Sequence, residues 1–145
     1  MRLWHATCVR LNGAHPGGAG LLLTGPSGSG KSDLALRLLH RGARLVGDDY
    51  VYLGAESGAL YAVAPREIAG KLEVRGLGVV MVNAIRVCRV AAVIELCPGA
   101  AIERLPEASR RDIEGVSLPC FRLDPFGAAA CEKLAMLIDG SGPGD

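Results

Sequence analysis

The residues with the clearest chemistry form an eight-residue, glycine-rich segment in the first quarter of the chain. The segment has the spacing G-x-x-x-x-G-K-S and consists of Gly25, Pro26, Ser27, Gly28, Ser29, Gly30, Lys31 and Ser32. Glycines let a backbone curl so that successive N–H groups point inward at phosphate oxygens. In such a loop the lysine reaches the β- and γ-phosphates, and the final serine ligates Mg²⁺. The segment therefore predicts a nucleotide site, and the alternative is a turn that only caps a helix.

A second candidate is the pair of adjacent carboxylates Asp48 and Asp49, which follows the short apolar run 44–47. A carboxylate at the end of a strand beside a phosphate loop can hold Mg²⁺, directly or through water. It can also take a proton from an attacking hydroxyl. Successive side chains at a strand end point in different directions, so the two residues could divide these tasks. A solvated Gly-Asp-Asp turn explains the spacing alone equally well.

Elements must hold these residues in place, and apolar spacing indicates where the elements lie. The run 20–24 enters the phosphate loop as a buried strand, and 33–41 leaves it as a helix with Gly42 as its expected C-cap. Strand, loop and helix in this order are the context that the phosphate-loop pattern requires. Further strands are expected at 3–11, 44–47, 50–53, 60–63, 87–96 and 116–123, and a second helix at 128–138.

The other segments are expected to be less regular. Glycines at 76 and 78 favour a loop with short strand ends for 71–82, and the arginine-rich stretch 102–115 is expected to be exposed. The chain has 145 residues, half of them hydrophobic, which is enough for one sizeable core. We therefore expect a single α/β domain over 1–145, with 139–145 as a flexible tail.

Composition argues against several classes of partner. The formal net charge is +1 and aromatic residues make up 4% of the chain, so neither nucleic acid nor an anionic membrane is the expected partner. No apolar stretch approaches the length of about 18 residues that spans a membrane, and no signal-peptide pattern is present. The five cysteines form no C-x-x-C pair and are odd in number. They favour reduced thiols and a cytoplasmic location.

Residues 73–82, with the sequence EVRGLGVVMV, resemble a family signature. The signature is E-I-R-G-L-G-I-I-N-V, from the catalytic domain of HPr kinase/phosphorylase, the serine kinase of the bacterial phosphotransferase system. Residues 41–49 resemble the family's R-G-x-R-L-V-x-D-D, His5 resembles its early histidine, and the phosphate loop lies between the two. Residues 103–105 are similar to the segment that bears a later catalytic arginine. The resemblance covers about 5–105, with Met81 where Asn is usual.

The resemblance implies an ATP- and Mg²⁺-dependent protein serine kinase that acts on an HPr-like phosphocarrier protein. The implied fold is a P-loop kinase domain on a mixed β-sheet, similar to phosphoenolpyruvate carboxykinase. A homo-oligomer is also implied, since family members are hexamers. The chain starts close to His5 and so resembles a shortened form without the N-terminal domain. A small-molecule P-loop kinase and a non-catalytic ATP-binding sensor are the two alternatives.

The same resemblance implies a role for each site residue. Ser32 and Glu73 would ligate Mg²⁺, and Asp49 would be the base for the protein serine hydroxyl, with Asp48 as second choice. Arg75 and Arg104 would stabilise transition-state charge, since Arg suits bidentate contact with phosphate. The histidine would orient Asp49 or the phosphate. The residues implied in catalysis are His5, Lys31, Asp48, Asp49, Arg75 and Arg104.

One segment departs from the family. The stretch 117–127, SLPCFRLDPFG, does not resemble the basic, glycine-containing segment that relatives use in dephosphorylation. This departure puts phosphorylase activity in doubt more than kinase activity.

Overall fold

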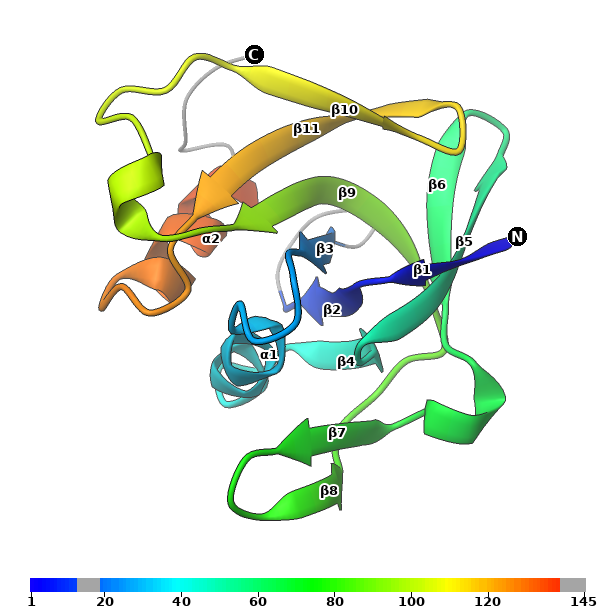
Figure 1. The fold of residues 1–145 in the computed structure, drawn as a ribbon. Coiled ribbons are helices and arrows are strands. Elements are labelled where there is room, and N and C mark those ends of the chain that lie inside the picture. The colour runs from blue at the N-terminus through cyan, green and yellow to red at the C-terminus, as the bar shows by residue number, and fades with distance from the viewer. Residues whose placement is uncertain (13–18, 139–145) are drawn as a thin grey trace.

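The structure is a computed structural model that describes residues 1–12 and 19–138 (Figure 1). Its helices are α1 (Lys31–Leu39) and α2 (Ala130–Ile138). Two short 3-10 turns, η1 (Arg66–Ile68) and η2 (Gly99–Ala101), lie between strands. The first six strands are β1 (Arg2–His5), β2 (Thr7–Leu11), β3 (Ala19–Thr24), β4 (Arg44–Gly47), β5 (Tyr50–Glu56) and β6 (Ala59–Val63). The others are β7 (Lys71–Val74), β8 (Gly78–Met81), β9 (Val87–Leu96), β10 (Ser109–Ile113) and β11 (Val116–Leu123).

Most strands form one mixed, curled sheet in the order β1-β5-β6-β9-β3-β2-β4, with β11 also paired to β9 and β10 paired to β11. The strands β3 and β11 both run parallel to β9, whereas β2 is antiparallel to its neighbours β3 and β4. The carboxyl ends of β3, β4, β9 and β11 therefore point the same way. Ligand sites of open α/β sheets form outside such strand ends. The expected α/β fold on a mixed sheet is confirmed.

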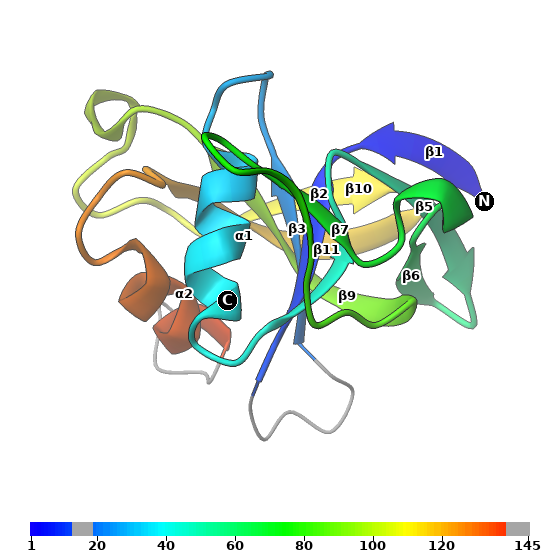
Figure 2. The same ribbon diagram turned by 90° about the horizontal axis from the view of Figure 1, so that it is seen from below.

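The side-chain alternation of β3 divides the core into two parts. Leu21 and Leu23 face a cluster that includes Leu34 of α1 and Leu134 of α2, whereas Leu22 faces a cluster with Val51 of β5. Successive side chains of a strand point to opposite faces, so one buried strand serves both clusters. In Figure 2 the two helices accordingly lie on one side of β2 and β3, with β5 and β6 on the other.

The expected elements around the phosphate loop are present. The helix α1 follows the loop, and its end has the hydrogen bonds of a Schellman motif, from Ala43 N–H to Leu38 O and from Gly42 N–H to Leu39 O. Gly42 has a φ of 93°, so the predicted glycine cap is confirmed. The expected strands at 50–53 and 60–63 are confirmed as the hairpin of β5 and β6, and the second helix is also confirmed, with small shifts of their ends.

Two expectations need correction, and one strand was not expected. Residues 3–11 are not one strand, because the chain turns at the buried Ala6 and passes from β1, paired with β5, to β2, paired with β3 and β4. Residues 71–82 form a regular hairpin of β7 and β8. The polar stretch 102–115 is mostly exposed, as expected, but it also contains the edge strand β10, whose charged side chains concealed its strand character.

Two other expectations concern the whole chain. The five cysteines are free, four of them buried and Cys97 half-buried. Within the described residues, neither helix has the length and apolar character to cross a bilayer. The predicted flexible tail at 139–145 lies outside the described residues.

Candidate active site

The phosphate loop is a tight turn that glycine makes possible. Gly25, Gly28 and Gly30 have φ values of 151°, 83° and 100°, in a region that L side chains rarely adopt. A Cβ on Gly25 would lie 2.6 Å from Ser29 Oγ, so the loop has no room for one there. The Ser29 N–H donates to Pro26 O at 3.0 Å and closes the turn. The loop thus leads directly from β3 into α1.

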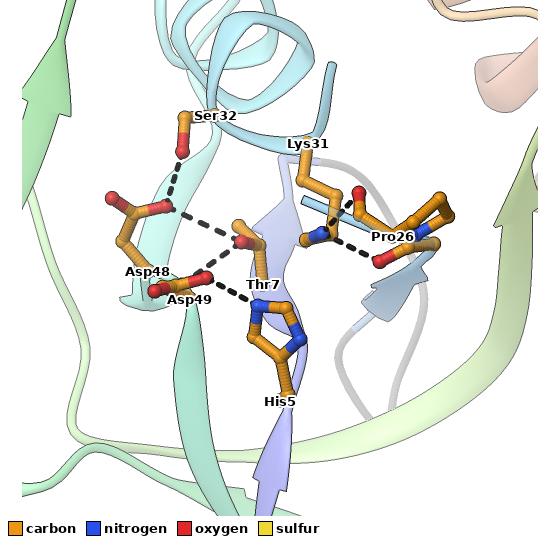
Figure 3. Close-up of polar contacts among 8 residues, drawn as sticks. His5, Thr7, Pro26, Lys31, Ser32, Asp48 and Asp49 are labelled. Atoms are coloured by element: carbon orange, nitrogen blue, oxygen red, sulfur yellow. Dashed lines mark hydrogen bonds and ion pairs between the residues drawn. The ribbon is translucent and has the colours of Figure 1, made fainter. Parts of the chain in front are cut away.

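Lys31, the first residue of α1, lies at the mouth of this loop. Its Nζ donates to Gly25 O at 2.6 Å and to Pro26 O at 3.1 Å (Figure 3). Burial lowers the pKa of the Lys31 ammonium from its usual value, and the carboxylates of Asp49 and Asp48 oppose this shift. The ammonium is therefore held between the loop carbonyls and a negatively charged strand end.

Asp48 lies at the end of β4 and contacts the start of α1. It is buried, and its Oδ1 accepts a hydrogen bond from Ser32 Oγ at 2.7 Å and another from Thr7 Oγ1 at 3.3 Å. Its other oxygen, Oδ2, accepts the backbone N–H of Glu73 at 3.3 Å. Three different elements thus fix the orientation of this carboxylate, and it points toward the serine of the phosphate loop.

Asp49 points in a different direction, toward β1. Its Oδ1 lies 2.6 Å from Nε2 of His5, and both side chains are partly exposed. The backbone of Asp49 has a φ of 70°, and Tyr50 N–H donates across it to Asp48 O at 2.8 Å, which makes a three-residue γ-turn. Such strained turns persist where the surrounding structure holds them, and they cluster at functional sites. The turn separates the two carboxylates, as Figure 3 shows.

These residues fit a nucleotide polyphosphate with Mg²⁺. Ser29 Oγ is buried with no hydrogen-bond partner among the described residues, and the N-cap Gly30 supplies no side-chain bond to the start of α1. The Ser29 hydroxyl, the backbone N–H groups at the start of α1 and the helix dipole all favour phosphate oxygens. Mg²⁺ in nucleotide sites takes one or two protein oxygens and completes its shell with phosphates and water. The adjacent oxygens of Ser32 and Asp48 match that requirement.

Three predicted site residues are not brought together with this group. The side chains of Glu73, Arg75 and Arg104 are exposed and make no hydrogen bond or ion pair with the described residues. Only the backbone of Glu73 reaches the site, because β7 packs against α1 through Leu72. Across 1–12 and 19–138, no three His, Cys, Asp or Glu side chains gather as a metal cluster.

Sequence reasoning missed Thr7, which links the two aspartates. Its buried hydroxyl donates to Asp48 Oδ1 at 3.3 Å and accepts the backbone N–H of Asp49 at 3.0 Å. The available signal was the position of Thr7 two residues after His5 within the expected strand 3–11, since alternate residues of a strand share a face. The apolar surroundings made it look like an ordinary core position.

Comparison with known proteins gives consistent matches. Residues 3–123 match the family described as HPr Serine kinase C-terminal domain. HPr kinase/phosphorylase of Clostridium novyi is 47% identical over 68 residues, and that of Clostridium tetani is 48% identical over 68 residues. Each alignment covers 47% of this chain and only 22% of the relative, so the match spans about a fifth of those proteins.

The fold has a counterpart among solved structures. The Hpr(Ser) kinase/phosphatase from Coxiella burnetii superposes with a TM-score of 0.83 at 22% sequence identity. The superposition covers 97% of each chain. At this identity the likeness establishes the fold alone.

Proposed function

This chain belongs to the family of HPr serine kinase C-terminal domains, and we propose that it is an ATP- and Mg²⁺-dependent protein serine kinase acting on an HPr-like carrier protein. The observation that carries the proposal is the meeting of two groups at one edge of the sheet. One is the phosphate loop with Lys31 and Ser32, and the other is the carboxylate pair at the end of β4. Both are required for phosphoryl transfer to a hydroxyl.

In the proposed reaction, Asp49 is the base. It accepts the proton of the carrier's serine hydroxyl while the serine oxygen bonds to the γ-phosphorus of ATP and the bond to the bridging oxygen of ADP breaks. His5, at 2.6 Å, orients the Asp49 carboxylate. This arrangement favours Asp49 over Asp48 as base, because Asp48 is buried and already accepts three hydrogen bonds.

Lys31 and Ser32 hold the other reactant. The ammonium of Lys31 would exchange its two loop carbonyls for the β- and γ-phosphate oxygens, which bind a cation more strongly. Mg²⁺, held by Ser32 and by Asp48 or Glu73, would supply further positive charge to these oxygens. We assign Arg75 and Arg104 to the transferring phosphoryl group, on the family resemblance, as exposed cations able to approach when the carrier docks.

We also propose that the reverse reaction, attack of inorganic phosphate on the phosphorylated carrier, is weak. That reaction brings two anions together and needs additional positive charge. Within 118–127 the chain has Arg122 as its one basic residue.

The family resemblance further suggests a hexamer in the cytoplasm, and both remain predictions. The exposed apolar side chains Leu77, Val79 and Met81 on the hairpin of β7 and β8 are compatible with a contact between copies. Light scattering on the purified protein measures the oligomeric state.

The test of the kinase proposal is incubation of the protein with an HPr-like carrier, Mg²⁺ and ATP labelled in its γ-phosphate. We expect label on one serine of the carrier and no label when that serine is replaced by alanine. With Asp49→Asn the label should appear at least about a hundredfold more slowly. Label on a small molecule in a cell extract would identify a small-molecule kinase. ATP binding without transfer to any acceptor would identify a sensor, and either result would overturn the proposal.

A further inference from the structure

The order of strands determines which way a bound nucleotide must run. The strand β3, which ends in the phosphate loop, lies between β2 and β9. On the β2 and β4 side are Asp48 and Asp49, toward which the γ-phosphate must point if these carboxylates serve transfer. The nucleoside then extends to the other side, over the carboxyl ends of β9 and β11 (Figure 1).

Residues 124–127, the first part of the connection from β11 to α2, lie on that other side and touch the phosphate loop. A Cβ built on Gly30 would lie 2.9 Å from Pro125 Cγ and 3.0 Å from Phe126 Cζ. Pro125 is buried, whereas Phe126 is 68% exposed. An aromatic ring thus stands open to solvent with its edge against the residue that precedes the phosphate-binding lysine.

The backbone of this connection is held by α1, the helix that follows the phosphate loop. Arg37 of α1 donates from Nη1 to Pro125 O at 2.5 Å and from Nη2 to Gly127 O at 3.4 Å. The N–H of Phe126 donates to Asp124 Oδ1 at 3.0 Å, and that of Gly127 to Asp124 O at 3.2 Å. The ring is therefore carried by a turn whose position relative to α1 is set before any ligand binds.

We propose that Phe126 is the platform on which the base of the nucleotide stacks. Every nucleobase has a π-face, and stacking on an exposed aromatic side chain contributes to affinity with little dependence on base identity. The site so formed binds the phosphates through the loop of Lys31 and the base through Phe126. This inference rests on the proposed function, because it takes for granted that the phosphate loop binds a nucleoside triphosphate.

The remaining aromatic residues do not compete for this role. Trp4 bonds Glu114 through its indole N–H, and the three tyrosines belong to β5 and β6. Phe121 is half-buried against the helix-side core. Phe126 is thus the aromatic residue that combines exposure with contact to the phosphate loop.

The test compares two ligands that share the phosphates and differ in the nucleoside. Calorimetry would measure the dissociation constants of Mg²⁺-ATP and Mg²⁺-tripolyphosphate for the wild type, Phe126→Ala, Phe126→Trp and the control Met136→Ala. Met136 is also a large, exposed apolar residue, but it lies on α2. We expect Phe126→Ala to weaken ATP binding about five- to a hundredfold. Tripolyphosphate binding should change less than twofold, which also shows that the variant is folded.

The other variants sharpen the result. Phe126→Trp should retain ATP affinity, Met136→Ala should match the wild type with both ligands, and GTP should lose as much as ATP from Phe126→Ala. Equal effects of Phe126→Ala on ATP and tripolyphosphate, or no effect on either, would overturn the stacking role while leaving the nucleotide site in place. A wild-type protein that binds neither ligand would overturn the proposed function and this inference together.

Discussion

Two neighbouring aspartates have opposite surroundings, and in the proposed function this difference gives them different tasks. Asp48 is buried, and its two oxygens accept hydrogen bonds from the hydroxyls of Ser32 and Thr7 and from the backbone N–H of Glu73. Asp49 is half exposed and its polar side-chain partner is His5. A carboxylate that shares hydrogen bonds with the loop serine suits a metal, whereas an accessible carboxylate beside an imidazole suits proton transfer.

The first prediction separates Asp48 from Glu73 as metal ligand. Asp48→Asn should raise the Mg²⁺ concentration for half-maximal activity, because it removes negative charge next to Ser32. The expected loss is about 1.5–3 kcal/mol in the free energy of Mg²⁺ binding. The exposed Glu73 was also predicted as a ligand, and Glu73→Gln tests it under the same conditions. Mg²⁺ titrations of the kinase rate give both values. A shift for Glu73→Gln alone would assign the metal to β7 and leave Asp48 a structural role.

The second prediction concerns the pair of Asp49 and His5. Asp49→Asn should lower kcat by about 10²- to 10⁴-fold, the usual contribution of a general base, while the affinity for ATP stays unchanged. His5→Ala should lower kcat less than Asp49→Asn does. In the Asp49→Asn background, His5→Ala should lower kcat by little further, because the histidine acts through that carboxylate. Single-turnover rates for the four proteins measure the coupling. Additive losses would show that His5 acts independently, on the phosphate.

Among the elements, those that the sequence made predictable are the ones with strong local signals. The strand, loop and helix around Lys31 follow from apolar spacing, glycine positions and the cap at Gly42. The strand β10 was missed because three of its five residues are charged. The break at Ala6 was missed because it depends on which distant strand each half pairs with, and that information is not local.

The site was predictable to the same extent. The residue types of the phosphate loop and the aspartate pair announced phosphate chemistry, but the pairing of Ser32 with Asp48 required the order of strands β3, β2 and β4. Thr7, Arg37 and Phe126 carry no motif. Only the fold brings Thr7 to the aspartates, Arg37 to the connection 124–127 and Phe126 to Gly30. Contacts between elements far apart in the chain were therefore what sequence reasoning could not supply.

The third prediction tests the contact between the phosphate loop and the connection 124–127. Gly28 and Gly30 both have positive φ, so an alanine strains the backbone at either position. A Cβ at Gly28 meets nothing within 4 Å, whereas one at Gly30 meets both Pro125 and Phe126. Gly30→Ala should therefore lower the free energy of unfolding by about 1–3 kcal/mol more than Gly28→Ala. Denaturant titrations measure the difference.

A double variant identifies the cause. Phe126→Ala removes one of the two obstructing side chains, so Gly30→Ala should cost less stability in that background than in the wild type. An unchanged cost would locate the strain in the loop backbone or in Pro125.

For the whole molecule, the arrangement of strand ends places different side chains on the two sides of the phosphate loop. The β4 side carries the carboxylates of Asp48 and Asp49. The β11 side carries Pro125 and the exposed Phe126, and the guanidinium of Arg37 there donates to the carbonyls of Pro125 and Gly127. Arg122 is exposed on β11 and donates to Ala101 O at 3.5 Å. This distribution supports the proposal that one phosphorylated ligand, the nucleotide, binds at a time.

The last prediction follows from this distribution of charge. The forward reaction pairs ATP with a neutral serine, whereas the reverse reaction must hold inorganic phosphate next to a phosphoserine. Both species of the reverse reaction are anions, and their repulsion falls with nearby positive charge. We expect phosphate-dependent release of pyrophosphate from the phosphorylated carrier to be at least about tenfold slower than kinase turnover, a difference of about 1.4 kcal/mol in barrier.

Phe126→Arg, which adds a cation beside Gly30, should accelerate the reverse reaction more than Met136→Arg, which adds the same charge on α2. Comparable forward and reverse rates in the wild type would show that other cations serve phosphate, and Arg104→Ala and Arg75→Ala would then identify them by selective loss of pyrophosphate release.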